Sequence, residues 1–233
     1  MGTEQHIQMG YQIIRLADYP DHNHTGLVPP MVLSVSGCIC ESIPGPWCID
    51  YASRPQEREP HAATFGLSPA AVEELVRWST DALDRRVFWP STLADLATAR
   101  EVAERFLPDR DRLKLVGLSL PHTETQTMLK EIGPSNYPFS EGFAHWMERW
   151  ETVAPTDGIL LGYEVLGLDI NQFHSWLCNW LEKMVYEKAG IRSGRYGLIQ
   201  SEADAFMAAR LCNECEGTEP VQWHAWALRE YAW

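Results

Sequence analysis

The chain has 233 residues, of which 45% are hydrophobic and 22% are charged, a composition typical of a globular protein. It carries 32 acidic and 19 basic side chains, and this formal net charge of −13 argues against nucleic acid as a partner, because phosphate binding needs a basic patch. No apolar run approaches the roughly 20 residues that span a bilayer. The first residues lack the basic and apolar parts of a signal peptide, so we expect a cytoplasmic protein with no membrane partner.

The N-terminal half alternates strand-like and helix-like segments. Residues 11–16 and 31–43 are rich in Ile and Val and are predicted to be strands. A helix is predicted from Ser68-Pro69, because a capping residue followed by proline is a common helix start. A second helix is predicted from Thr92, where residues 92–95 resemble a capping box, to the residue before Pro108.

The next segments continue this alternation. Residues 113–120 form an apolar run typical of a buried strand, and residues 123–132 are predicted to be a short helix. The aromatic residues of 143–150 repeat at helical spacing, which predicts another short helix. Residues 158–170 have the strongest strand pattern in the chain.

The strongest helical pattern follows directly and ends at Gly190. Its apolar residues are Phe173, Trp176, Leu177, Trp180, Leu181, Met184 and Val185. Trp180 lies near the centre of this stripe, so we expect it to be fully buried.

The C-terminal residues complete the predicted fold. Ser201 is expected to cap a last helix that runs through Cys215, and residues 221–233 are expected to form an aromatic strand. The sequence therefore predicts a single compact α+β domain over residues 1–233, with a mixed or antiparallel sheet packed against several amphipathic helices. A weaker alternative is a domain boundary near residues 107–112.

The six cysteines are expected to be mostly reduced thiols, because the chain has no export features. Cys212 and Cys215 form a solitary C-x-x-C, whereas a structural zinc site needs four ligands. Cys38 and Cys40 would share one face of an extended strand and could add a second pair only if the fold brought them close. We therefore expect no zinc at Cys212 and Cys215, and no cofactor.

Two arrangements could support a hydrolase. His174 and Cys178 are four residues apart on the predicted helix, so a thiol and an imidazole would share one face. His22 and His24 alternate in a polar loop and could bind a metal with help from distant residues such as His61 or His122. Both arrangements compete with structural explanations: a histidine at the edge of the core with a thiol inside it, and a solvated turn. The Gly-rich turn of residues 192–197 could bind an anion or merely reverse the chain.

Acidic residues and tryptophans together suggest a surface that binds a protein. Glu202 and Asp204 lie at the start of the last predicted helix, and Glu214, Glu216 and Glu219 lie at its end. Ten tryptophans are too many to assign to inner faces, and Trp78 falls off the apolar stripe of its helix. Acidic residues speed the encounter with a basic partner, and exposed aromatic residues provide affinity. The alternative is a solvated acidic surface with the tryptophans in a large core.

Residues 162–167 (GYEVLG), 173–179 (FHSWLCN) and 196–199 (YGLI) resemble segments of small acidic bacterial proteins, some of them immunity proteins that accompany polymorphic or contact-delivered toxins. The resemblance covers the C-terminal third and implies a cytosolic protein that binds and blocks a toxin enzyme. It assigns no catalytic residue.

The sequence therefore favours a non-enzymatic cytoplasmic binding protein that occludes the active site of a basic toxin domain. The partner-binding residues that we predict are Trp78, Glu202, Asp204, Glu214, Glu216 and Glu219. The rival hypothesis is a cysteine- or metal-dependent hydrolase that uses His174 and Cys178 or the loop of His22 and His24.

Overall fold

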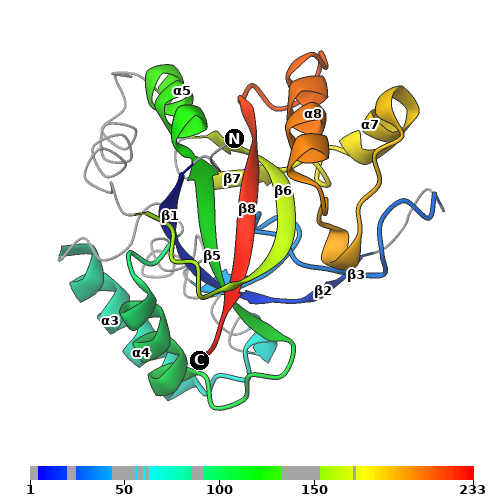
Figure 1. Ribbon diagram of the computed structural model, residues 1–233. Helices are drawn as coiled ribbons and strands as arrows, with labels where there is room; N and C mark the ends of the chain where they lie inside the picture. The colour runs from blue at the N-terminus through cyan, green and yellow to red at the C-terminus, as the bar shows by residue number, and fades with distance from the viewer. Residues whose placement is uncertain are drawn as a thin grey trace.

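The protein is built around an antiparallel sheet of six strands in the order β4-β1-β5-β8-β6-β7 (Figure 1). The computed structural model describes residues 5–19, 25–43, 56, 60, 63–84, 92–132, 153–169 and 172–233. The strands are β1 (His6–Arg15), β4 (Ser42–Ile43), β5 (Leu113–Pro121), β6 (Ile159–Asp169), β7 (Gln172–Ser175) and β8 (Trp223–Tyr231). A separate two-stranded ribbon pairs β2 (Ala17–Asp18) with β3 (Met31–Val32).

Helices lie around the curled sheet. Those within the described residues are α3 (Pro69–Asp84), α4 (Leu96–Phe106), α5 (His122–Ile132), α7 (Leu181–Ala189) and α8 (Glu202–Asn213). The pair α3 and α4 lies beside the β1 side of the sheet, whereas α8 packs on β8 and β6, with α7 beside it (Figure 1). The predicted α+β class with an antiparallel sheet is confirmed.

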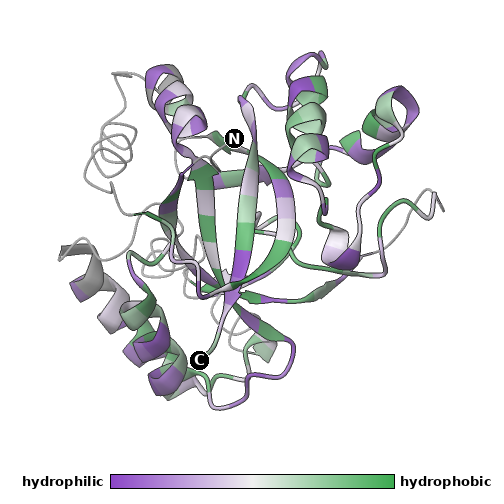
Figure 2. Cartoon of the chain, in the orientation of Figure 1, coloured by the Kyte–Doolittle hydropathy of each residue, from purple (hydrophilic) through white to green (hydrophobic). Residues whose placement is uncertain are grey.

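The central strands are buried on both faces, which explains their apolar sequences. All six residues from Trp223 to Leu228 of β8 are buried, as are those from Leu115 to Pro121 of β5. Figure 2 shows hydrophobic or intermediate colours over most of the sheet, whereas hydrophilic colours recur along α3, α4 and α5. Because β5 follows residues 107–112 and pairs with β1 as well as β8, the chain on both sides of that stretch contributes to one sheet.

The helix ends follow the local sequence. Ser201 Oγ accepts a hydrogen bond from Asp204 N at 3.3 Å and so caps α8 as predicted. Gly190 ends α7 with a φ of 71°, the left-handed conformation that glycine favours. The second helix begins later than predicted: Asp95, not Thr92, is the cap of α4, and its carboxylate accepts from Thr98 N at 2.8 Å.

The prediction of one strand over residues 31–43 is wrong. Only the two ends are extended, as β3 and β4, and a turn separates them in which Ile39 N and Cys40 N both donate to Ser36 O at 3.0 Å. Cys38 and Cys40 therefore do not share a sheet face, since Cys38 is exposed and Cys40 is buried.

The prediction of one helix from Phe173 to Gly190 is also wrong in its first half. Residues 172–175 are β7, which pairs with β6 from Asp169↔Gln172 to Leu166↔Ser175. A turn covers residues 176–180, and the helix begins only at Leu181.

No helix in the described residues is long and apolar enough to cross a membrane. The helix predicted within residues 143–150, the loop of His22 and His24, and His61 lie outside the described residues.

Candidate functional site

The predicted acidic residues lie on α8 and on the loop that follows it. We call Glu202, Asp204, Glu214, Glu216 and Glu219 the acidic surface. Four of them are exposed and Glu219 is half-buried. The first turn of α8 contains Glu202 and Asp204, where the helix dipole favours negative charge. Glu214 is the C-terminal cap of the helix, and Glu216 follows it, where the dipole disfavours negative charge.

Three of these carboxylates have partners within the chain. Glu202 Oε1 lies 3.1 Å from His6 Nε2, and Glu219 Oε1 lies 3.8 Å from His174 Nδ1. Glu214 is 3.9 Å from Arg210, one helical turn earlier. Within the described residues, Asp204 and Glu216 form no side-chain ion pair, which leaves these two carboxylates the most available to an external cation.

The expected exposure of the tryptophans is wrong for Trp78. Its side chain is only 5% exposed and packs against Phe106 of α4, with ring centroids 6.3 Å apart. Trp223 and Trp226 of the C-terminal strand are also buried, and Trp226 packs edge-on against Phe173 at 5.3 Å. Trp78 is therefore part of the core and does not belong to a binding surface.

Trp180 is the exposed tryptophan that the sequence pattern placed in the core. Its exposed fraction is 60%, and its backbone is left-handed, with a φ of 54° and a ψ of 33°. A bulky residue in this conformation is strained, and such strain is often found at functional positions. Trp180 directly precedes α7, which packs on α8, so this side chain and the acidic surface belong to neighbouring elements.

His174 and Cys178 do not form the predicted pair. His174 lies on β7, where its ring faces Glu219, whereas Cys178 lies in the following turn with its sulfur 3.3 Å from Ser36 Oγ. Burial, as the main cause, raises the pKa of the Cys178 thiol to about 11. This shift opposes thiolate formation, whereas an activated nucleophile needs a lowered pKa.

Beside Cys178 lies a buried carboxyl group, that of Glu164 on β6. Ser34 Oγ donates to Glu164 Oε1 at 2.5 Å and Val35 N donates to Oε2 at 2.9 Å, and the Ser175 hydroxyl adds a further hydrogen bond. Burial nevertheless raises the pKa of Glu164 to about 7. No motif in the sequence marks this group, and the signal for it is an acidic residue inside the strongest strand pattern.

A second polar chain, Ser119–His6–Glu202, has the connectivity of a hydrolase relay. His6 Nδ1 lies 3.3 Å from Ser119 Oγ, and Nε2 lies 3.1 Å from Glu202. The exposure of its members argues against catalysis, because the hydroxyl that would act as nucleophile is buried and the acid is not. Ser119 is 2% exposed, whereas the Glu202 side chain is 46% exposed. A substrate would meet the acid first and the nucleophile last, so we interpret this chain as a link between α8 and the sheet.

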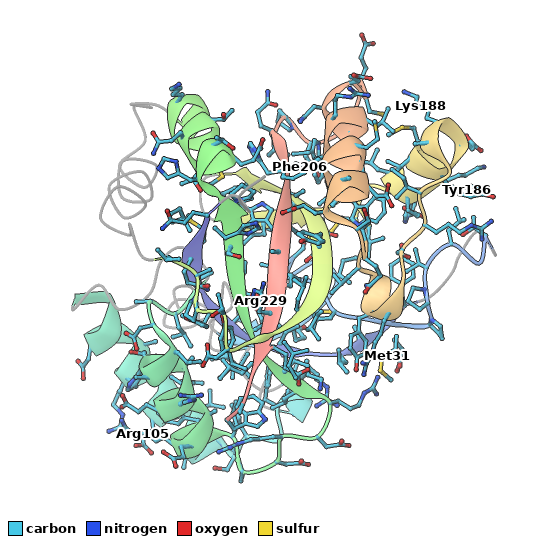
Figure 3. The ribbon with its side chains drawn as sticks, in the orientation of Figure 1. Met31, Arg105, Tyr186, Lys188, Phe206 and Arg229 are labelled. Atoms are coloured by element: carbon cyan, nitrogen blue, oxygen red, sulfur yellow. The ribbon has the colours of Figure 1, made fainter. Side chains whose placement is uncertain are left out.

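The basic turn of residues 192–197 uses its arginines within the chain. Tyr186 extends from α7 away from α8 (Figure 3), and the Arg192 guanidinium stacks on its ring at 4.3 Å. Arg195 stacks in the same way on Tyr196 at 4.5 Å. Both guanidinium groups thus have aromatic partners.

Cys212 is buried in α8, and Cys215 follows it at half exposure. In the part of the chain that the structure describes, no group of three or more His, Cys, Asp or Glu residues is arranged to hold a metal ion.

Comparisons of the chain with family models, with curated proteins and with solved structures find no match.

Proposed function

We propose that the chain is a non-enzymatic binding protein of the immunity type, which occludes the active site of a basic toxin domain. The observation that carries the proposal is the exposure of the acidic surface on one helix and its following loop. Exposed charges of one sign raise the rate at which an oppositely charged partner is captured.

The position of two of these carboxylates adds support. Glu214 and Glu216 lie at the end of α8, where negative charge weakens a helix, and the exposed pair of Glu214 with Arg210 offsets little of this cost. Binding to a basic partner would explain both carboxylates. In a nuclease or a nucleotide-using toxin, these carboxylates would occupy the basic cleft in place of the anionic substrate.

Trp180 takes the place of Trp78 as the aromatic anchor in this proposal. Exposed tryptophans contribute strongly to binding when a partner buries them. The backbone of Trp180 already has a defined left-handed conformation at the start of α7, so the main chain there need not be ordered on binding, which lowers the entropic cost of association.

The experiment uses the protein encoded by the gene directly upstream of the gene for this chain. It measures growth protection and complex formation. The wild-type chain should protect cells that produce that protein and should co-purify with it. Trp180→Ala should weaken the complex by about tenfold or more. Trp233→Ala is the matched control, since Trp233 is also partly exposed but stacks on Arg110 at 5.1 Å, beside α4.

Failure of the wild-type chain to bind or protect would refute the immunity proposal. If Trp180→Ala reduces binding and protection no more than Trp233→Ala does, Trp180 is not part of the interface.

A further inference from the structure

Two turns from distant parts of the chain meet at the hydroxyl group of Ser36. One is the turn of residues 35–40, between β3 and β4, and the other is the turn of residues 176–180, between β7 and α7. Cys178 Sγ lies 3.3 Å from Ser36 Oγ, and the backbone N of Cys38 donates to the same oxygen at 3.3 Å. Each turn therefore places a cysteine beside Ser36.

The two thiols are close enough to influence each other. After burial, a negative charge on Cys38 is among the causes that raise the pKa of Cys178. Gln172 of β7 donates to Cys38 Sγ at 3.6 Å, which ties the exposed thiol to the strand that leads into Cys178. Cys38 and Cys178 thus belong to the two turns that meet at Ser36.

Exposure gives the two cysteines different roles. Cys38 is exposed and accessible to a small oxidant, whereas Cys178 is half-buried. Cys40 is buried and its thiol donates to Val32 O at 3.6 Å, so it faces the interior. An exposed thiol with a second thiol beside it is the arrangement in which a first oxidation product is resolved as a disulfide.

We propose that Cys38 and Cys178 are a peroxide-responsive pair, which oxidises to a disulfide joining the 35–40 turn to the 176–180 turn. Hydrogen peroxide first converts the Cys38 thiol to a sulfenic acid, with release of one water. Although burial raises the pKa of the Cys178 thiol, a sulfenic acid condenses readily with a neighbouring thiol. The Cys178 sulfur then attacks the Cys38 sulfur, and the hydroxyl of the sulfenic acid leaves with the Cys178 proton as a second water. Two thiols and one peroxide become one disulfide and two waters. This inference goes beyond the proposed function and does not depend on it.

The experiment is oxidation of the reduced protein followed by peptide mapping. The protein is treated with a small excess of hydrogen peroxide, its remaining thiols are alkylated, and it is digested with trypsin without reductant. The peptide of residues 16–58, which contains Cys38 together with Cys40 and Cys48, should be linked through Cys38 to the peptide of residues 150–183, which contains Cys178. The number of titratable thiols should fall from six to four.

Three variants and one physical measurement separate this pair from other thiols. Cys38→Ser and Cys178→Ser should each abolish the link, whereas Cys215→Ser, which removes another half-exposed thiol, should retain it. Oxidation should raise the urea midpoint of the wild-type protein but not of the first two variants, because a disulfide between distant residues restricts the unfolded chain. Equal midpoints of all proteins under reducing conditions show that the variants fold.

Several results would overturn the proposal. One is a link that survives in Cys38→Ser, because it would then involve Cys40 or Cys48 of the same peptide, and another is oxidation confined to the peptide that contains both Cys212 and Cys215. A third is conversion of Cys38 to sulfinic or sulfonic acid with no cross-link, because it would show that Cys178 cannot reach the oxidised sulfur.

Discussion

Glu164 is a carboxyl group that the fold removes completely from water. The donors around it come from the 31–40 segment and from β7, so this one side chain joins both to β6. These hydrogen bonds stabilise an ionised carboxylate, but burial deprives it of hydration. The loss of hydration is the larger effect, so the pKa of Glu164 rises to about 7. The native protein therefore holds a proton that the unfolded chain releases at lower pH.

This difference predicts how stability depends on pH. Because the folded-state pKa of Glu164 lies above that of the unfolded chain, its contribution falls as the pH rises from about 4.5 to about 7, by on the order of 3 kcal/mol. Glu164→Gln cannot ionise and should lose this part of the slope. Urea unfolding of both proteins between pH 4.5 and 8 tests this, and the difference between them removes the contribution of the histidines. A difference that stays constant over this range would contradict the assignment.

Truncation of Trp180 and of Trp226 should change the free energy of unfolding by different amounts. Trp180 is 60% exposed, so Trp180→Ala should change the free energy of unfolding by no more than about 0.5 kcal/mol. Trp226 is fully buried against Phe173, so Trp226→Ala should cost about 3–5 kcal/mol through the cavity that it leaves. Urea unfolding of the two variants measures both values. Equal losses would place Trp180 in the core after all.

Residues 172–180 form a strand and a turn, although their sequence predicts a helix. Phe173, Trp176, Leu177 and Trp180 have helical spacing, but short apolar runs do not separate helix from strand. Pairing with β6 makes residues 172–175 a strand. Trp180 then adopts a left-handed backbone, which the periodicity of the sequence does not predict. The dyad predicted from His174 and Cys178 depended on this helix and was lost with it.

The burial of Trp78 differs from the prediction for another reason. The sequence of α3 shows one narrow apolar stripe, whereas α4 packs beside α3 and widens the buried face to include Trp78 against Phe106. In contrast, the starts of α3 and α8 and the end of α7 were predictable, because Pro69, Ser201 and Gly190 act locally.

Two glycines with positive φ should differ in what a methyl group costs. Gly190→Ala places alanine at a φ of 71° with no atom within 4 Å of the new Cβ, so it should cost about 1 kcal/mol from backbone strain alone. Gly10→Ala combines a φ of 123° with a Cβ only 2.5 Å from Thr92 Oγ1, so it should cost about 3 kcal/mol or more. Urea unfolding tests the order, and a smaller loss for Gly10→Ala would show that the 92–93 segment does not pack on β1 as described.

The exposure of the acidic surface is easier to predict from the sequence than the exposure of Trp180. Charged residues at helix ends remain at the surface in nearly any fold, and Glu202, Asp204, Glu214 and Glu216 are indeed exposed. Whether a tryptophan is exposed depends on which elements pack over it, and this information is not local.

Capture of a basic partner by the acidic surface is tested by the association rate with the toxin domain at low and high salt. Glu214→Lys/Glu216→Lys reverses two exposed charges of the acidic surface and leaves Glu219, which contacts His174, in place. Glu101→Lys/Glu104→Lys makes the same change in charge on α4, on the other side of the molecule (Figure 1). Both variants should remain folded, because exposed charges contribute little to stability.

The Glu214→Lys/Glu216→Lys variant should associate about tenfold more slowly than the wild-type protein at low salt. High salt should remove most of this difference, since charges more than about 8–10 Å apart are screened near physiological ionic strength. The dissociation rate should change less. The α4 variant should slow association much less than the first. Equal association rates of the wild-type protein and the Glu214→Lys/Glu216→Lys variant at both salt concentrations would contradict the claim that this surface captures a basic partner.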